Sequence, residues 1–299
     1  MKTLTIFTPA YNRAHTLVRT YQSLCNQTCK DFEWLLIDDG STDNTAEIVK
    51  KWIEEADFSI HYIYQENQGM HGAHNTAYKN ITTELNTCID SDDFMPIDAV
   101  ENIVTFWGNN KNNKYAGFIG LDQREDGSII GSSFPLEMKE TTLLDFYAKG
   151  GTGDKKIVYR TDVIKQYPEY PLFEGERYVG LAYKYMLIDQ DYKLLTLNKP
   201  LVTVEYQADG SSNMMWKQYW NNPRGFAFFR KTEMVVAPTL KRKFISCIHY
   251  VSSCIISKNK KVITESPQKI LTLLAIIPGV ILYYIIKRKV KQNKSLVVK

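Results

Sequence analysis

The sequence lacks the features that mark several common protein classes. Its 299 residues contain five cysteines and no C-x-x-C pair, which argues against a disulfide framework and against a structural zinc site. It has no G-x-x-x-x-G-K-[ST] loop and no G-x-G-x-x-G after the first apolar run, so the usual phosphate-binding loops are missing. That run, Leu4–Ala10, passes directly into Tyr11-Asn12-Arg13 without a cleavage pattern. We therefore expect it to belong to the fold and not to a secretory signal.

Acidic residues become rare in the C-terminal part. Residues 215–299 carry 17 Lys and Arg against 2 Asp and Glu, whereas residues 1–214 carry 20 against 31. The overall charge of +4 therefore hides two regions of opposite sign. Such a basic region suits either anionic lipid headgroups or nucleic acid.

No apolar run reaches the length of an ordinary membrane span. Residues 270–286 form 17 residues without a charge, interrupted by Pro278-Gly279 and followed by Lys287-Arg288-Lys289. A spanning helix needs about 20 apolar residues, so a bent helix or one in the membrane plane fits better. A buried terminal helix is the alternative. The expected partner is a membrane surface and not nucleic acid, because an uncharged run adds nothing to phosphate contact.

Aromatic residues support the same interpretation. We expect them to be exposed and to favour the membrane interface; they are Trp216, Tyr219, Trp220, Phe226, Phe228 and Phe229. Residues 213–299 are thus predicted to form a basic, helical, membrane-associating region.

The first hundred residues alternate strand and helix patterns at short spacing. Strands are expected at 3–8, 34–37 and 60–64, with a fourth running into Asp90, and amphipathic helices between them. This order predicts an α/β fold with a mostly parallel central sheet flanked by helices. Residues 99–212 have a mixed pattern and are expected to add to the same sheet. After residue 214 the sequence predicts helices at 215–233, 239–257 and 267–290.

Asp90-Ser91-Asp92-Asp93 packs three carboxylates into four residues at the end of the fourth predicted strand. Acids this close repel one another unless a cation or a set of donors receives them. Hard oxygen ligands select Mg²⁺ or Mn²⁺. The alternative is an acidic turn that caps the next helix.

Two further polar clusters follow earlier strands. They are Pro9-Ala10-Tyr11-Asn12-Arg13 and Asp38-Asp39. The carboxyl ends of parallel strands meet at one edge of a sheet, where such folds bind ligands. The three clusters together offer the acceptors, the polar loop and the cation site that a nucleoside diphosphate needs.

Four motifs closely resemble the family 2 glycosyltransferases of the GT-A fold. They are residues 8–13, residues 35–45, Asn67-Gln68-Gly69 with Ala73-His74-Asn75, and residues 90–93, in family order over roughly residues 1–98. The resemblance implies an inverting transferase that uses a nucleotide-diphosphate sugar, in particular a UDP-sugar, with Mg²⁺ or Mn²⁺.

The resemblance also assigns roles to individual positions. Residues 1–98 would form the nucleotide-sugar-binding half and residues 99–212 the acceptor-side half. Asp92, together with Asp90, would hold the metal. Asp90 would also contact the donor with a further set of residues: Pro9, Tyr11, Arg13, Asp38, Asp39, Asn67 and Gly69. The general base is expected at Glu176, with Glu174 as the alternative; both could instead begin a solvated helix.

Two departures from the family pattern concern the donor and acceptor contacts. Met70 stands where relatives tend to have a basic residue, and Gly180-Leu181 where they tend to have another acid.

The expected function is transfer of a sugar to a growing, lipid-linked surface glycan at the cytoplasmic face of the plasma membrane. The alternatives are a sugar nucleotidyltransferase and a catalytically degenerate membrane-bound scaffold.

Overall fold

The computed structural model describes residues 2–205 and 215–296, without the side chains of residues 293–296. The chain divides into two compact units, which are described separately. The first unit comprises residues 1–169 and 188–206, and the second comprises residues 170–187 and 207–299. The expected boundary at 212/213 lies outside the described residues.

The first unit is built on one eight-stranded sheet with the order β3-β2-β1-β4-β7-β5-β8-β6. The strands are β1 Leu4–Ala10, β2 Phe32–Asp38, β3 Ser59–Tyr64, β4 Leu85–Cys88, β5 Tyr115–Gln123, β6 Glu140–Thr141, β7 Lys155–Arg160 and β8 Lys193–Thr203. β1 to β4 pair in parallel, whereas β7 is antiparallel to both β4 and β5. The predicted mostly parallel central sheet is confirmed.

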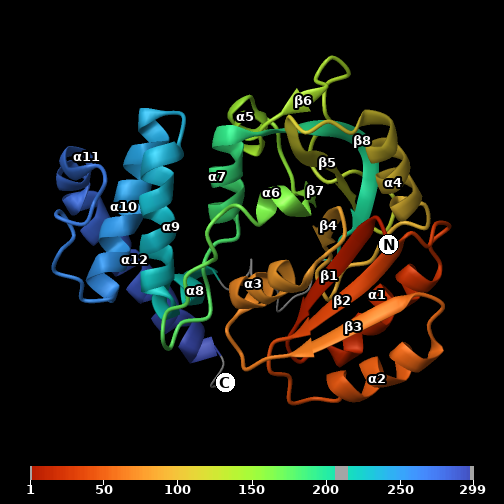
Figure 1. Ribbon diagram of the computed structural model, residues 1–299. Coiled ribbons are helices and arrows are strands. Elements are labelled where there is room, and N and C mark those ends of the chain that lie inside the picture. Colours follow the sequence, from red (N-terminus) through yellow and green to blue (C-terminus); the bar gives the residue numbers. More distant parts are fainter. Residues whose placement is uncertain (1, 206–214, 297–299) are drawn as a thin grey trace. The chain divides into compact units, whose positions relative to one another are not determined.

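Helices cover both faces of this sheet (Figure 1). The helices of this unit are α1 Ala14–Cys25, α2 Thr45–Glu55, α3 Met70–Asn80, α4 Ala99–Asn110, α5 Leu143–Ala148 and α6 Thr161–Ile164. Ile6 and Trp34 belong to a buried cluster that also contains residues of α1, α2 and α4. Phe7, the next residue of β1, instead packs edge-on against His74 and Tyr78 of α3. Residue alternation in β1 therefore places α3 on the opposite face.

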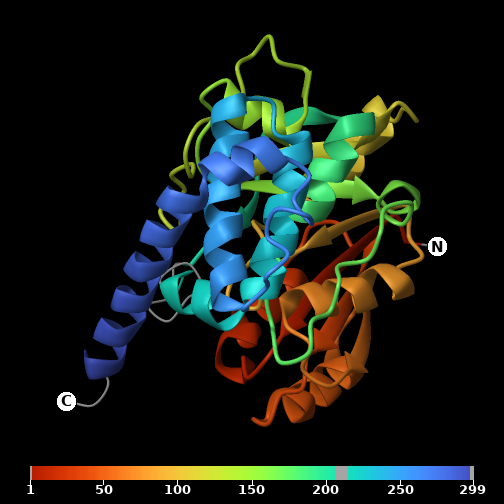
Figure 2. The same ribbon diagram turned by 90° about the vertical axis from the view of Figure 1, so that its left-hand side faces the viewer.

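The second unit is helical. Its helices are α8 Met215–Asn221, α9 Pro223–Val236, α10 Leu240–Ile256, α11 Lys269–Leu274 and α12 Ile276–Leu296, and the chain passes between the units within α7 (Ala182–Asp191). α10 packs against both α9 and α12 around the buried Cys247 and Tyr250. Figure 2 shows α9 and α10 side by side and α12 as one long helix.

Two predicted helices are each divided in two. Residues 215–233 form α8 and α9, because Pro223 cannot continue a helix but suits the first position of the next one. Residues 267–290 form α11 and α12, divided at Ala275. Pro278 lies in the first turn of α12, where the missing N–H is tolerated. The break expected at Pro278-Gly279 therefore falls three residues earlier.

The exposed apolar surface of the second unit differs from the expected one. Phe226 is 3% exposed, and the other five aromatics named above are half-buried. They pack on one another, for example Tyr219 on Phe226 with 4.3 Å between ring centroids. Most of the exposed large apolar residues instead lie on α11 and α12, with Ile270 at 78% and Ile277 at 74%, and others lie at the end of α9 and on α10. None of the helices in the described ranges has the length and apolar character needed to span a bilayer.

Candidate functional site

The parallel strands bring the three predicted clusters to one edge of the sheet. The register pairs Ala10 with Asp38 and Asp38 with Tyr64, so β1, β2 and β3 end together. Phe7 pairs with Cys88, which places the end of β4 beside β1. The three clusters, which are up to eighty residues apart in sequence, thus lie at the carboxyl ends of neighbouring strands.

Asn12 joins the loop after β1 to the loop after β2. Its side-chain oxygen accepts a hydrogen bond from the backbone N–H of Thr42 at 2.8 Å, and its own N–H donates to the hydroxyl of Ser41 at 2.9 Å. Its φ of 54° lies in the left-handed region, which Asn tolerates better than most residues. Asp43 adds a second connection by accepting the N–H of Ala14 at 3.1 Å. These hydrogen bonds hold the two loops together at this edge of the sheet.

Asp38 and Asp39 are buried, at 1% and 3% exposure. The Asp38 carboxylate accepts the backbone N–H of Ser41 at 2.8 Å and the hydroxyl of Tyr62 at 2.5 Å. This bond and burial both raise the pKa of Tyr62, with burial the larger cause. The predicted nucleotide-binding acids therefore also hold the loop that follows β2.

Asp39 connects this loop to the start of α3. Its two oxygens accept the backbone N–H groups of Gln68 at 2.9 Å and Gly69 at 2.8 Å. Gly40 has a φ of 87°, and a Cβ atom there would lie 2.9 Å from the backbone nitrogen of Asn67. Only glycine permits this close approach at positive φ. The structure thus brings the predicted residues Asn67 and Gly69 to Asp39.

The other predicted donor residues lie in or directly after β1. Pro9 is a buried residue of the strand, Tyr11 is 50% exposed, and Arg13 is half-buried at the N-terminal end of α1. An exposed aromatic ring and a cation therefore follow the strand at this edge.

The three aspartates after β4 differ in their surroundings. Asp90 and Asp92 are half-exposed, whereas Asp93 is 6% exposed and accepts the backbone N–H of Glu205 at 3.1 Å. Lys156 of β7 donates to the backbone carbonyl of Cys88 at 2.9 Å. A cation is therefore built into the same strand end as the acids.

Electrostatic interactions connect Lys156 with the acids around it. Burial would lower the pKa of Lys156, but Asp122 and Asp90 raise it above its ordinary value. Burial, with repulsion from Asp90, raises the pKa of Asp93 to about 7, and burial raises that of Asp122 to about 6, with Lys156 opposing both shifts. The edge therefore favours the presence of positive charge.

Asp90 and Asp92 fit a metal ion whose remaining ligands come from a bound diphosphate and water. Mg²⁺ is usually held by one or two carboxylates together with phosphate oxygens and water. Within residues 2–205 and 215–296, no three His, Cys, Asp or Glu side chains are grouped to hold a metal ion. Two half-exposed carboxylates at a strand end could supply the protein ligands of such a site.

Glu176 and Glu174 belong to the second unit. The Glu176 carboxylate is 6% exposed and accepts the backbone N–H of Gly225 at 2.9 Å, together with the backbone N–H and the Nε of Arg224 at 3.1 and 2.9 Å. It therefore caps the N-terminus of α9. Glu174 is exposed, and Arg224 donates to its backbone carbonyl and not to its carboxylate.

Sequence reasoning missed Lys156 and Asp122. Neither belongs to a recognisable motif, and both come from strands that begin more than twenty residues beyond the last cluster. The antiparallel pairing of β7 with β4 and β5 brings them to this edge. Only the topology of the sheet could have indicated them.

The chain is similar to proteins described as glycosyltransferases. It is 29% identical over 229 residues to the glycosyltransferase GlyA of Streptococcus pneumoniae serotype 4, a match that covers 73% of this chain and 32% of GlyA. The chain spans about a third or less of the first three curated relatives, namely 32%, 29% and 14% of their lengths.

Two solved structures share the fold. S. aureus TarS 1-349 in complex with UDP-GlcNAc has a TM-score of 0.57 at 17% identity, over 98% of this chain and 92% of that one. The mannosyltransferase PcManGT of Pyrobaculum calidifontis, in complex with GDP-Man and Mn²⁺, has a TM-score of 0.56 at 15% identity, over 94% and 87%. At these identities the likeness concerns the fold alone.

The family model described as "Glycosyl transferase family 2" matches residues 5–167. This range contains β1 to β4, the three strand-end clusters and the strand that carries Lys156. With the mostly parallel sheet and its flanking helices, the match shows that the chain belongs to glycosyl transferase family 2 and has the GT-A fold.

Proposed function

We propose that this protein transfers a sugar from a nucleotide-diphosphate sugar, specifically a UDP-sugar, to a glycan acceptor. The observation that carries the proposal is the meeting of three polar clusters at one sheet edge in a family 2 chain. The structures of TarS and PcManGT, whose ligands are UDP-GlcNAc and GDP-Man, support a nucleotide-sugar donor.

In this proposal the ordered loops receive the nucleoside. The half-exposed ring of Tyr11 offers a stacking surface for the base. Each oxygen of the Asp38 carboxylate accepts one of the two hydrogen bonds described above and can accept a second from a base or ribose donor, and Asp39 would contact the nucleotide beside it. Arg13, Asn67 and Gly69 line the same edge, so the donor would bind without large rearrangement of the loops.

Asp90 and Asp92 would hold Mg²⁺ or Mn²⁺ against the diphosphate. Bound there, the metal would neutralise the charge that develops on the leaving nucleoside diphosphate. Lys156 adds a fixed positive charge at the same strand end. The Mn²⁺ in the PcManGT complex supports the choice of metal.

We further propose that the reaction inverts the anomeric carbon, with a glutamate carboxylate taking the proton of the acceptor hydroxyl. Glu176 and Glu174 are the two candidates. Glu176 is ordered by three N–H donors, and Glu174 is the more exposed. Direct attack from the face opposite the leaving group needs one such base.

The proposed acceptor is a growing, lipid-linked surface glycan at the cytoplasmic face of the plasma membrane. Support comes from an apolar stripe on α12, in which Ile277, Ile281, Tyr284 and Ile285 are 74%, 55%, 61% and 43% exposed. Their spacing places them on one side of the helix. Lys287, Arg288 and Lys289 follow directly. An apolar stripe beside basic residues suits a helix in the membrane plane.

A donor panel tests the proposed reaction. The purified protein would be mixed with Mg²⁺ and each of several UDP-sugars, with GDP-mannose and UTP as comparisons, while thermal stability and product release are measured. We expect metal-dependent stabilisation by one UDP-sugar, about 2.7 kcal/mol at a hundredfold excess over Kd, and release of UDP. Pyrophosphate release from UTP and a sugar phosphate would instead indicate a nucleotidyltransferase. Failure of every donor to bind would indicate a scaffold.

A further inference from the structure

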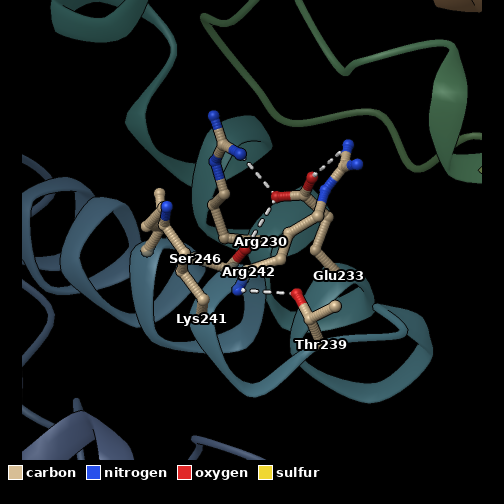
Figure 3. A pocket seen from close by; sticks show the side chains of 7 residues that line it. Arg230, Glu233, Thr239, Lys241, Arg242 and Ser246 are labelled. Carbon is tan, nitrogen blue, oxygen red and sulfur yellow. Dashed lines mark hydrogen bonds and ion pairs between the residues drawn. The ribbon is translucent and has the colours of Figure 1, made fainter. Parts of the chain in front are cut away.

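A polar pocket opens in the second unit between α9 and the first turns of α10 (Figure 3). Its volume is about 340 Å³, at the small end of ligand-binding pockets. The lining residues are Arg230, Glu233, Thr239, Lys241, Arg242, Ile245 and Ser246. Three of the seven are cationic and one is acidic, so the pocket is suited to an anion.

The single acid is already neutralised by the protein. The Glu233 carboxylate is 6% exposed, forms an ion pair with Arg230 and accepts the hydroxyl of Ser246 at 2.9 Å. A guanidinium nitrogen of Arg242 lies 3.9 Å from its other oxygen, and Figure 3 shows the two guanidinium groups approaching the carboxylate from different sides. Lys241 has no ion pair among the described residues. The pocket therefore keeps a surplus of positive charge.

Donors in the pocket also remain without acceptors. The Nε of Arg230 is buried and has no hydrogen-bond partner in the described part of the chain. Thr239 caps α10 by accepting the backbone N–H of Arg242 at 3.3 Å, but the first N–H groups of a helix have no acceptor within the helix. The first turn of α10 contains no acidic residue. Lys241 and Arg242 thus lie at the positive end of the helix dipole, which an anion would stabilise.

Apolar side chains lie next to these cations. Leu240, which directly precedes Lys241, is 68% exposed, and Ile245 of the pocket wall is 42% exposed. A free inorganic anion would make no use of this apolar surface. A ligand with an anionic head and hydrocarbon chains would use both.

We propose that this pocket binds the phosphate headgroup of an anionic membrane lipid. Arg242 and Lys241 donate to the phosphate oxygens, and the acyl chains lie along Leu240 and Ile245. The proposal rests on the membrane location proposed above, but it is independent of the donor site.

The test is co-sedimentation with phosphatidylcholine vesicles that contain or lack phosphatidic acid. The double variant Lys241→Gln/Arg242→Gln is compared with Lys260→Gln/Lys261→Gln, which removes the same charge from exposed positions between α10 and α11. Two basic residues near an anionic surface contribute enough to change binding by more than tenfold. We expect phosphatidic acid to increase the affinity of the wild type for the vesicles. In the pocket variant the affinity for these vesicles should be lower by at least about tenfold. The control variant should keep most of the increase.

Three results would overturn the proposal. The first is an equal loss in both variants, because it would mean non-specific charge attraction. The second is no gain from phosphatidic acid in the wild type. The third is thermal stabilisation by inorganic phosphate without any vesicle preference, which would assign the pocket to a free anion. Binding to pure phosphatidylcholine vesicles tests the α12 stripe independently of the pocket. UDP release by the same proteins tests the proposed transferase reaction. Failure of the pocket proposal can therefore be told apart from failure of either of the others.

Discussion

Individual carboxylates in this protein have separable tasks. Asp39 and Asp93 accept backbone N–H groups and hold loops, whereas Asp90 and Asp92 are half-exposed at the strand end. Glu176 fixes the start of α9, and Glu174 is exposed. A change at each position should therefore affect folding and turnover to different degrees.

The pair Glu176 and Glu174 offers a matched comparison. If Glu176 is the base, Glu176→Gln should lower turnover by about 10²–10⁴-fold with donor binding retained. It should also lower the free energy of unfolding by about 1–3 kcal/mol, because one N–H donor would lose its acceptor. Glu174→Gln, at an exposed position, should change neither by much. Turnover and urea unfolding of both variants check this.

The opposite pattern would reassign the base. Loss of turnover in Glu174→Gln, with Glu176→Gln less stable but still active, would make Glu174 the base and Glu176 a positioning residue for Arg224.

Among the elements, strands and helices follow local patterns, and one of the two unexpected helix breaks coincides with a proline, Pro223. The strands expected at 34–37 and 60–64 fall within β2 and β3, and the helix expected at 239–257 corresponds to α10. The periodicity of residues 215–233 continues through Pro223, so pattern alone did not reveal the break. The exposure of the aromatics in α8 and α9 depends on contacts between helices, which a single sequence does not contain.

The pairing of β5 with β7 depends on one glycine. Gly117 has a φ of 141°, and a Cβ atom there would lie 2.1 Å from the carbonyl oxygen of Val158. Gly117→Ala should therefore lower the free energy of unfolding by about 2 kcal/mol or more. Gly108→Ala in α4, where nothing lies within 4 Å of the added atom, should be neutral or gain up to about 1 kcal/mol. Thermal unfolding of both variants tests this, and equal stabilities would contradict it.

The functional edge could be predicted only as far as its motifs extend. Asp38, Asp39, Asp90 and Asp92 directly follow or end predicted parallel strands, so their convergence follows from the order of the elements. Lys156 lies on a strand inserted antiparallel between β4 and β5. That non-local pairing has no short sequence signature.

At the scale of the whole molecule, opposite charges are divided between the two parts of the sequence. Residues 1–214 have a net charge of −11 and residues 215–299 of +15. The acidic part contains the strand-end acids proposed to bind a metal and donor. The basic part contains the α12 stripe and the pocket of α9 and α10. This division agrees with an enzyme whose C-terminal helices face an anionic surface.

The α12 stripe gives a prediction about membrane association. Ile277→Asp/Ile281→Asp should abolish co-sedimentation with phosphatidylcholine vesicles, because charged side chains would enter the apolar interface. Val18→Asp/Ile53→Asp, at exposed positions of α1 and α2, is the control and should leave sedimentation unchanged. If the α12 variant still binds, with its fold intact by circular dichroism, the stripe does not contact the membrane interface.

Asp92 is proposed to serve a metal-dependent transfer from a nucleotide-sugar. The most direct test of this proposal is UDP release from the UDP-sugar that stabilises the wild type, with Mg²⁺ or with EDTA, for the wild type and Asp92→Asn. We predict that EDTA stops the wild-type reaction, and that Asp92→Asn lowers the rate by about 10²–10³-fold or more. Equal rates in the wild type and Asp92→Asn, or a wild-type rate insensitive to EDTA, would contradict the account.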